Sequence, residues 1–414
     1  MLQIDKLDIP IQRKTAISVY WQTAYALGLP VVLWRSPKQL SKHLILSFDP
    51  NIQTSKIDIE EAPMGFALSP FYNPDGTKTF FIEADLYCKF DAAANTNTEQ
   101  HKYPEVQPER MVWESALKQF KTNVPSSHNR LNKDKSWRVS SREDDFTKNH
   151  YQEIVAKAVK AIEVGSFQKV VLSRKKEVEL SDNFQPVEKF DELCECYPNA
   201  FVSMIYLPNL NQIWLGASPE TLVSIDENGI FRTMALAGTQ SAYDEDGHIK
   251  SVKHAQWTQK EIEEQAFVSR YIIDCLKKIR VREFIEEGPK TIIAGNLIHL
   301  RTDFSIDTEA IRFPELGSVM LDLLHPTSAV CGMPKVEALQ FILENEGYNR
   351  SFYAGYLGPI NVENESMVYV NLRCMKIEGH IATLYAGAGI TEDSDPDREW
   401  QETEIKCQTL LKIL

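Results

Sequence analysis

The sequence has little of what would place the protein in a membrane, outside the cell or on nucleic acid. Among its 414 residues no apolar run approaches the ~20 residues that span a bilayer, and the N-terminus lacks the basic and apolar regions of a secretory signal. The seven cysteines form no CxxC pair, which argues against a disulfide framework and a structural zinc site. A net charge of -13 disfavours nucleic acid, whose phosphates require clustered Lys and Arg. We therefore expect a cytoplasmic protein with neither a membrane nor nucleic acid as partner.

What remains is the composition of an acidic globular protein. Hydrophobic residues make up 43% of the chain, which is enough for one large domain or for two packed halves. An anionic substrate would need local Lys, Arg or a metal ion to reverse the field of the acidic chain. We expect a monomer, with a weak dimer as the alternative.

The composition and the hydrophobic periodicity of the sequence change near residue 145. Residues 1–145 begin with short apolar segments between turns and end, from about residue 92, in a polar connection that contains one possible short helix at residues 110–120. In residues 146–414, helical patterns at 253–279, 334–346 and 397–414 separate runs of strand patterns. Strands in runs, rather than strict alternation with helices, favour an α+β fold with largely antiparallel sheets. We expect residues 146–414 to form the catalytic region.

Two of these helical patterns place carboxylates on an apolar face. On a helix that turns about 100° per residue, Glu399, Glu402 and Lys406 of "EWQETEIK" share the side of the C-terminal leucines. Glu264 likewise falls within a stripe formed by Trp257, Val268, Tyr271 and Cys275. Each glutamate alone fits a structural ion pair, but two such carboxylates in a chain without a His/Cys cluster suit Mg²⁺.

Several other motifs carry candidate residues that are individually weak. "KVVLSR" places Lys169 at the head of a strand, "GASPE" places Glu220 after a proline, and "ALAGT" contains Gly238 and Thr239, whose backbone N–H groups could approach an oxyanion. Each motif alone also fits a structural role, such as a lysine at a strand end, a turn acid or a glycine turn.

The order of these motifs along the chain is more specific than any one of them. KVVLSR, GASPE, ALAGT, HPTSAVCGMP, YAGYLG, LRC, GAGI and EWQETEIK, in this order, resemble the chorismate-utilising enzymes, which include isochorismate synthase, anthranilate synthase component I, aminodeoxychorismate synthase and salicylate synthase. The resemblance covers about residues 146–412. It implies two α/β halves whose sheets pack together with helices outside, and a Mg²⁺-dependent reaction on chorismate in a site between them.

The resemblance also divides the candidate residues between metal and substrate. It implies that Glu264 and Glu402 bind Mg²⁺, with Glu399 in the same cluster. The residues that it implies for the substrate, mostly for its carboxylates, are Gly238, Thr239, His325, Arg373, Tyr385, Gly387 and Lys406. For His325 and Tyr385 a packing role is the alternative.

Lys169 separates the activities within the family. Isochorismate synthases resemble this chain in having lysine there, as the base for water, whereas ammonia-using anthranilate synthases typically lack it. Lys169 would activate water for attack at C2, and Glu220 would protonate the departing C4 hydroxyl to give isochorismate for menaquinone or siderophore synthesis. Salicylate synthase is the alternative, followed by an ammonia-using anthranilate or aminodeoxychorismate synthase component and by a catalytically silent binding protein. Gln265 stands where many members have His, and Ser328 where they have Pro.

Overall fold

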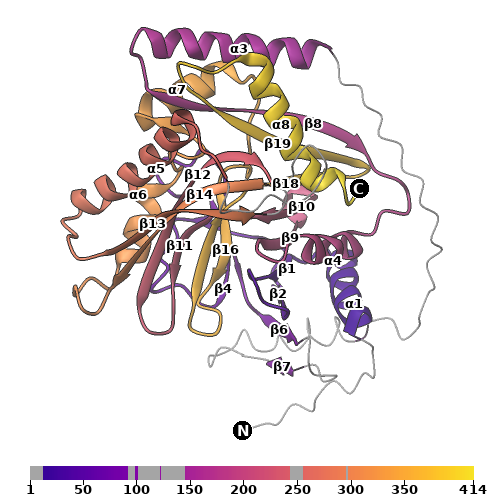
Figure 1. Ribbon diagram of the computed structural model, residues 1–414. Coiled ribbons are helices and arrows are strands. Elements are labelled where there is room, and N and C mark those ends of the chain that lie inside the picture. Colours follow the sequence, from indigo (N-terminus) through magenta and orange to yellow (C-terminus); the bar gives the residue numbers. More distant parts are fainter. Residues whose placement is uncertain (1–12, 92–97, 101–121, 123–144, 243–254, 295–296) are drawn as a thin grey trace.

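The computed structural model describes residues 13–91, 98–100, 122, 145–242, 255–294 and 297–414, and all statements below concern this part of the chain (Figure 1). Its strands form two sheets in which every pair is antiparallel. The ten-stranded sheet has the order β15 (Gly332–Met333), β8 (Lys169–Glu179), β19 (Ile381–Ile390), β18 (Cys374–Glu378), β10 (Gln212–Ser218), β9 (Phe201–Leu207), β1 (Val31–Arg35), β2 (Lys42–Leu46), β6 (Leu86–Phe90) and β7 (Thr98–Gln100). The nine-stranded sheet has the order β13 (Ile285–Ala294), β14 (Leu297–Asp307), β12 (Ile230–Ser241), β11 (Thr221–Ile225), β17 (Ser366–Val370), β16 (Tyr356–Ile360), β4 (Gly65–Ser69), β5 (Thr79–Glu83) and β3 (Thr54–Ser55). The expected α+β fold with antiparallel sheets is confirmed.

Helices cover the outer faces of the paired sheets (Figure 1). α5 packs against β12, α7 against β8 and α4 against β9, while α3 packs on α8, which itself lies on β19. The described helices are α1 (Arg13–Ala26), α3 (Asp145–Glu163), α4 (Pro186–Cys196), α5 (Gln259–Lys278), α6 (Leu316–Leu324), α7 (Lys335–Asn345) and α8 (Pro396–Leu411), with a short 3₁₀ helix, η1 (Pro208–Leu210). None of them combines the length and apolar character that a membrane-spanning helix needs.

The N-terminal third of the chain supplies strands to both sheets. β1 pairs with β9, with Val31 opposite Tyr206, and so extends the ten-stranded sheet. β4 pairs with β16, with Ser69 opposite Tyr356, and so extends the nine-stranded sheet. The division at residue 145 stays a prediction, and the short helix predicted at residues 110–120 lies outside the described residues.

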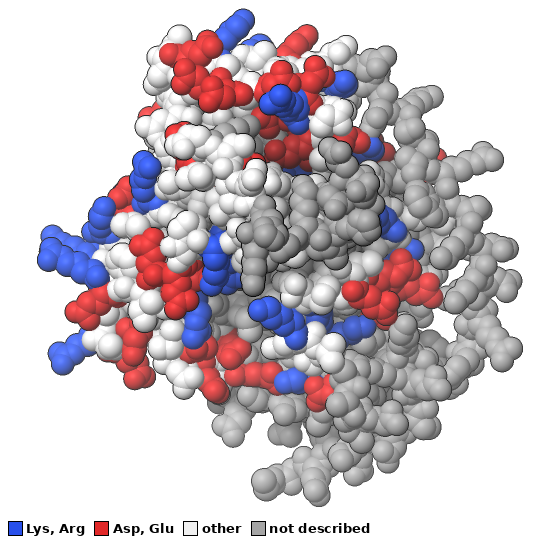
Figure 2. All heavy atoms as spheres, viewed as in Figure 1, with Lys and Arg blue, Asp and Glu red and all other residues white. Residues whose placement is uncertain are grey.

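Two apolar clusters follow from the alternation of side chains along the strands. In β1, Val32 and Trp34 point into the cluster between the two sheets, whereas Val31 and Leu33 point to the outer face, where α1 contacts β1, and belong to a second cluster that includes residues of α1, α4 and α8. All five residues of β1 are buried because both faces of this strand are covered. On the face shown in Figure 2, acidic and basic side chains are interspersed over the described surface.

The predicted phases of the two carboxylate-bearing helices are confirmed. In α8, Gln401 and Gln408 are exposed, while Glu399 and Trp400 are buried. Pro396 begins this helix, and the side chain of Asp395 caps it by accepting from the N–H of Arg398 at 3.0 Å. In α5, Val268 and Cys275 are buried, and a capping box between Thr258 and Glu261 fixes the first turn.

Candidate active site

A cavity between the two sheets gathers most of the candidate residues. From the ten-stranded sheet, β8 contributes Val171, and β19 contributes residues 385–387 and Gly389; from the nine-stranded sheet, β12 and β14 contribute Thr239 and His299. Helices α5 and α8 bring Glu264 and Lys406 to the same cavity, and the β10–β11 connection brings Glu220. Residues from Val171 to Lys406 therefore meet at one place.

Lys169 lies fully buried beside this cavity. Its Nζ lies 2.9 Å from Oε1 of Glu264, whose carboxylate is about one-fifth exposed. Gly389 makes room for both side chains, because a Cβ atom at this position would lie 2.8 Å from Oε1 of Glu264 and 3.1 Å from Cε of Lys169. The second glycine of "GAGI", Gly389, is thus required because the side chains of Glu264 and Lys169 pass close to its Cα atom.

Glu220 lies in the wall of the cavity with its side chain withdrawn from water. The residue is only 4% exposed, and burial raises the pKa of its carboxyl to about 8 against the opposing charges of Lys169 and Arg373. Its backbone is fixed because its carbonyl accepts from the N–H of Val370 at 3.0 Å. Glu220 is therefore mostly protonated at neutral pH and can donate a proton.

Gly238 and Thr239 form a bulge in the pairing of β12 with β14. The register shifts between Ala237 and Gln240, and Gly238 has a φ of +67°, which favours glycine. The Gly238 N–H donates to Oε2 of Glu264 at 3.3 Å. The bulge thus brings a backbone donor and a carboxylate together at the cavity wall.

His299 lines the cavity although the sequence analysis did not select it. Its Nδ1 lies 2.8 Å from the carbonyl oxygen of Gly238, so Nδ1 carries the proton that this bond requires. Burial lowers the pKa of His299 to about 3, so the ring is neutral and Nε2 is an acceptor. This buried Nε2 has no hydrogen-bond partner among the described residues. In the sequence, a single His between Ile298 and Leu300 of a buried strand gives no signal that separates it from a core residue.

Lys406 and Glu402 form an ion pair at the rim of the cavity. The Lys406 Nζ lies 2.6 Å from Oε1 of Glu402 and donates to the carbonyl oxygen of Gly387 at 2.7 Å. Glu402 lines an adjoining hollow together with Thr239 and Lys406. Glu399 is 2% exposed and lines neither space; its charge instead acts on Tyr151, whose pKa burial raises.

Arg373 and Tyr385 lie in the wall of the same cavity. Arg373 has a φ of +47°, a strained conformation of the kind that is concentrated at functional sites, and burial lowers the pKa of its guanidinium. Tyr385 stacks between Tyr353 and Trp214, with ring centroids 5.3 and 5.6 Å away. The stack fixes the Tyr385 ring as a flat wall.

The structure does not bring His325 to this cavity. Its Nε2 donates to the carbonyl oxygen of Pro70 at 3.0 Å, and its ring packs edge-on against Tyr356. His325 lines a separate cavity with Lys335 and Tyr356, and burial lowers the pKa of its imidazole to about 3. Its position therefore fits the packing alternative considered for it.

Comparisons with known proteins bear on the family and on the fold. A sequence profile described as "Chorismate binding enzyme" matches residues 84–414, which is most of the chain. The chain belongs to the chorismate-binding enzyme family. The resemblance found in the sequence motifs is thereby confirmed.

The relatives of this chorismate-binding chain carry different names. Isochorismate synthase EntC of Escherichia coli (strain K12) is 28% identical over 302 residues, which cover 73% of this chain and 75% of that protein. The solved structure of MenF, the menaquinone-specific isochorismate synthase from Escherichia coli, matches with a TM-score of 0.70 and 21% identity over 93% of this chain and 88% of that chain. Anthranilate synthase component I from Streptococcus pneumoniae matches with a TM-score of 0.66 and 20% identity over 99% of this chain and 94% of that chain. The fold is thus shared by enzymes named for different reactions and does not by itself select one.

The donors present in this chorismate-binding enzyme fit a hard cation. The carboxylates of Glu264 and Glu402 approach the Gly238–Thr239 bulge from α5 and from α8. Within the described residues, no group of three or more His, Cys, Asp and Glu side chains is arranged to hold a metal. Mg²⁺ commonly takes only one or two protein carboxylates and completes its shell with water and substrate oxygens, so the pair is a suitable donor set.

Proposed function

We propose that the protein is an isochorismate synthase that converts chorismate to isochorismate. The observation that carries the proposal is the presence in one cavity wall of Glu220, whose pKa burial raises to about 8, with Lys169 beside the same cavity against Glu264. One side chain can receive a proton from water while the other supplies a proton to a leaving hydroxyl. Similarity to isochorismate synthase EntC over 73% of the chain supports the same assignment.

The reaction uses both groups in one displacement. Water attacks ring C2 while Lys169, as the free amine, takes a proton from it; the ring double bonds shift and the C4–O bond breaks. Glu220 gives its proton to the departing hydroxyl, which leaves as water. One water enters and one leaves, so the net change is an isomerisation.

Cationic and backbone groups would hold the two carboxylates of the substrate. Arg373 and Lys406 supply the positive charge that an anionic substrate needs in a chain of net charge -13, and the Gly238–Thr239 bulge offers backbone donors. The unpartnered Nε2 of His299 would accept a hydrogen bond from a ring hydroxyl. These contacts orient the ring between Lys169 and Glu220.

Glu264 and Glu402 would hold Mg²⁺ beside the substrate, with Glu399 next to Glu402 on α8. Bound there, Mg²⁺ would neutralise a substrate carboxylate and draw electron density toward it. In the structure both glutamates are paired with lysines, Glu264 with Lys169 and Glu402 with Lys406.

One incubation tests the proposal. Purified protein is mixed with chorismate and Mg²⁺, with and without ammonium, and the products are separated by chromatography. Isochorismate alone is the expected result. Salicylate with pyruvate would instead identify a salicylate synthase, an aminated product an ammonia-using enzyme, and unchanged chorismate a binding protein. Lys169→Ala should lose at least ~100-fold in kcat, and full activity in this variant would refute the assigned base.

A further inference from the structure

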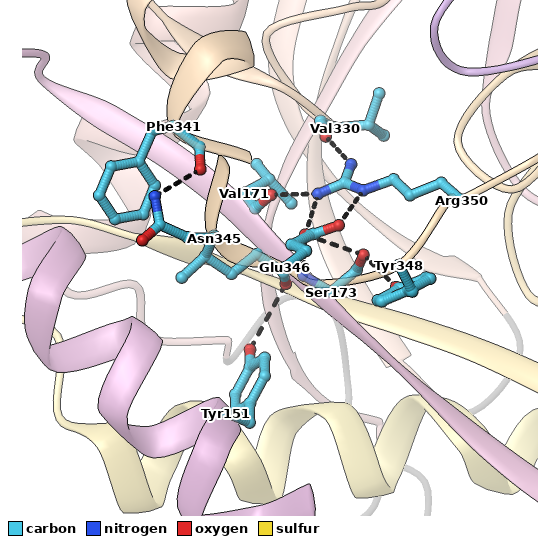
Figure 3. A network of polar contacts seen from close by, with 10 residues as sticks. Tyr151, Val171, Ser173, Val330, Phe341, Asn345, Glu346, Tyr348 and Arg350 are labelled. Carbon is cyan, nitrogen blue, oxygen red and sulfur yellow. Dashed lines mark hydrogen bonds and ion pairs between the residues drawn. The ribbon is translucent and has the colours of Figure 1, made fainter. Parts of the chain in front are cut away.

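A buried ion pair lies directly behind the strand that carries Lys169. Glu346 and Arg350, four residues apart after α7, are each only 2% exposed, and the Arg350 Nε donates to Oε2 of Glu346 at 2.8 Å (Figure 3). The guanidinium also lies over the ring of Phe71, 4.2 Å from its centroid. A buried ion pair often stabilises a fold no better than apolar residues of the same size. Stability alone therefore does not account for this pair, and its hydrogen-bond partners indicate a second role.

Two further hydrogen bonds of Arg350 go to neighbouring backbone segments in the wall of the candidate active site. Nη2 donates to the carbonyl oxygen of Val171 at 2.6 Å, and Nη1 donates to that of Val330 at 2.9 Å (Figure 3). Val171 and Val330 both line the substrate cavity. One planar guanidinium therefore ties strand β8 to the loop that faces the same cavity.

Glu346 completes this arrangement on β8. Its Oε1 accepts from the N–H of Ser173 at 2.7 Å and from the Ser173 hydroxyl at 3.0 Å. In an antiparallel strand, the N–H and C=O groups of every second residue point to the same edge, so Val171 and Ser173 present theirs to the edge opposite β19. The neighbour on that edge, β15, pairs only with Lys169 and Val170, and its last contact beyond them is from the Val171 N–H to Cys331. The ion pair thus takes over the hydrogen bonding of β8 where β15 ends.

We infer that the Glu346–Arg350 pair positions the backbone of β8, and with it Lys169, against the loop at Val330. The inference rests on the proposed function, in which Lys169 is the base. Lys169 lies two residues before Val171 on the same strand, and its Nζ must stay near Glu264 while facing the substrate. Displacement of a reacting group by about 1 Å can cost on the order of 100-fold in rate.

A double variant separates positioning from stabilisation. Glu346→Leu with Arg350→Met removes both charges together, so no buried charge is left unpaired. We expect kcat for chorismate consumption to fall about 10- to 100-fold, with KM changed less than about threefold. Hydrogen exchange should show loss of protection at the Ser173 amide. The control is Lys42→Met with Asp191→Leu, which removes a partly buried ion pair between β2 and α4, away from the cavity, and should leave kcat unchanged.

Each outcome decides the inference. A folded double variant with the kcat of the wild type refutes positioning, as does an equal loss of kcat in the control. If the double variant does not fold, Arg350→Lys is used, since lysine keeps the charge but lacks the planar fork; a kcat within twofold of the wild type refutes the inference. Failure of both variants to fold would show that the pair serves the fold alone. A wild-type protein that consumes no chorismate refutes the proposed function instead, and with it the base to be positioned.

Discussion

The raised pKa of Glu220 predicts how activity depends on pH. A carboxyl with a pKa of about 8 is about 90% protonated at pH 7 and about 9% protonated at pH 9, whereas at its ordinary pKa of 4.5 it would be less than about 1% protonated at pH 7. The acid form is the one that donates, so its contribution is complete below the pKa and is lost as pH rises through about 8. We therefore expect kcat/KM, which reports the free enzyme, to fall about tenfold between pH 7 and pH 9.

Glu220→Gln is the matching variant, because an amide of the same size cannot donate the proton to a leaving hydroxyl. Its kcat at pH 7 should be about 100- to 10,000-fold lower than that of the wild type, and the fall above pH 8 should disappear from its profile. Initial rates of chorismate loss are measured from pH 6 to 9, with circular dichroism at each pH to confirm that the protein stays folded. A wild-type kcat/KM that is flat between pH 7 and pH 9, or a variant that keeps more than about a tenth of the activity, would refute the assignment of Glu220 as the acid.

Three further predictions follow from contacts in the structure. Glu402→Gln removes one of the two carboxylates assigned to Mg²⁺ and should raise the Kd for Mg²⁺ in isothermal titration at least about tenfold; an unchanged Kd would place the ion elsewhere. Gly389→Ala puts a methyl group 2.8 Å from Oε1 of Glu264 and 3.1 Å from Cε of Lys169, so kcat should fall about 100-fold while the protein stays folded. A wild-type kcat would mean that Glu264 and Lys169 can move away from the methyl group without loss of activity. Arg35→Met removes five hydrogen bonds that a buried guanidinium donates to backbone carbonyls, one in the last turn of α4 and three in the connection that follows it, and should lower the free energy of unfolding in urea by about 3 to 5 kcal/mol; a loss below about 1 kcal/mol would contradict this prediction.

Local features of the fold could be predicted because they depend on residues close in sequence. Helical periodicity alone predicted that Glu264 and Glu402 face the interior. The burial of Trp400 and the exposure of Gln401 confirm the predicted phase of α8. Lys406, the partner of Glu402, lies one turn further along the same helix, but the partner of Glu264 could not be predicted in the same way. The contact of Glu264 with Lys169 joins a helix to a strand almost a hundred residues earlier, and only the tertiary structure brings them together.

Two histidines show that a sequence motif can both suggest a residue that lies outside the candidate active site and miss one that lines it. His325 stands in a motif that pointed to the substrate, yet the structure binds it to the carbonyl of Pro70 in another cavity. His299 stands in an ordinary buried strand, yet it lines the candidate active site with an acceptor nitrogen that no other described residue hydrogen-bonds. The difference depends on which neighbours fill the space around each ring, and residues near them in sequence do not determine that.

The contribution of the N-terminal third to both sheets has a consequence for synthesis of the chain. β1 and β4 each pair on one edge with a strand nearby in sequence, β2 and β5, but the other edge of β1 must wait for β9 and that of β4 for β16. At translation rates of about 5 to 20 residues per second, these strands leave the ribosome on the order of tens of seconds before their partners. During that interval one edge of each strand is unpaired and its apolar face is exposed, so nascent chains and truncated products that stop before β9 are expected to need chaperones and to be prone to aggregate.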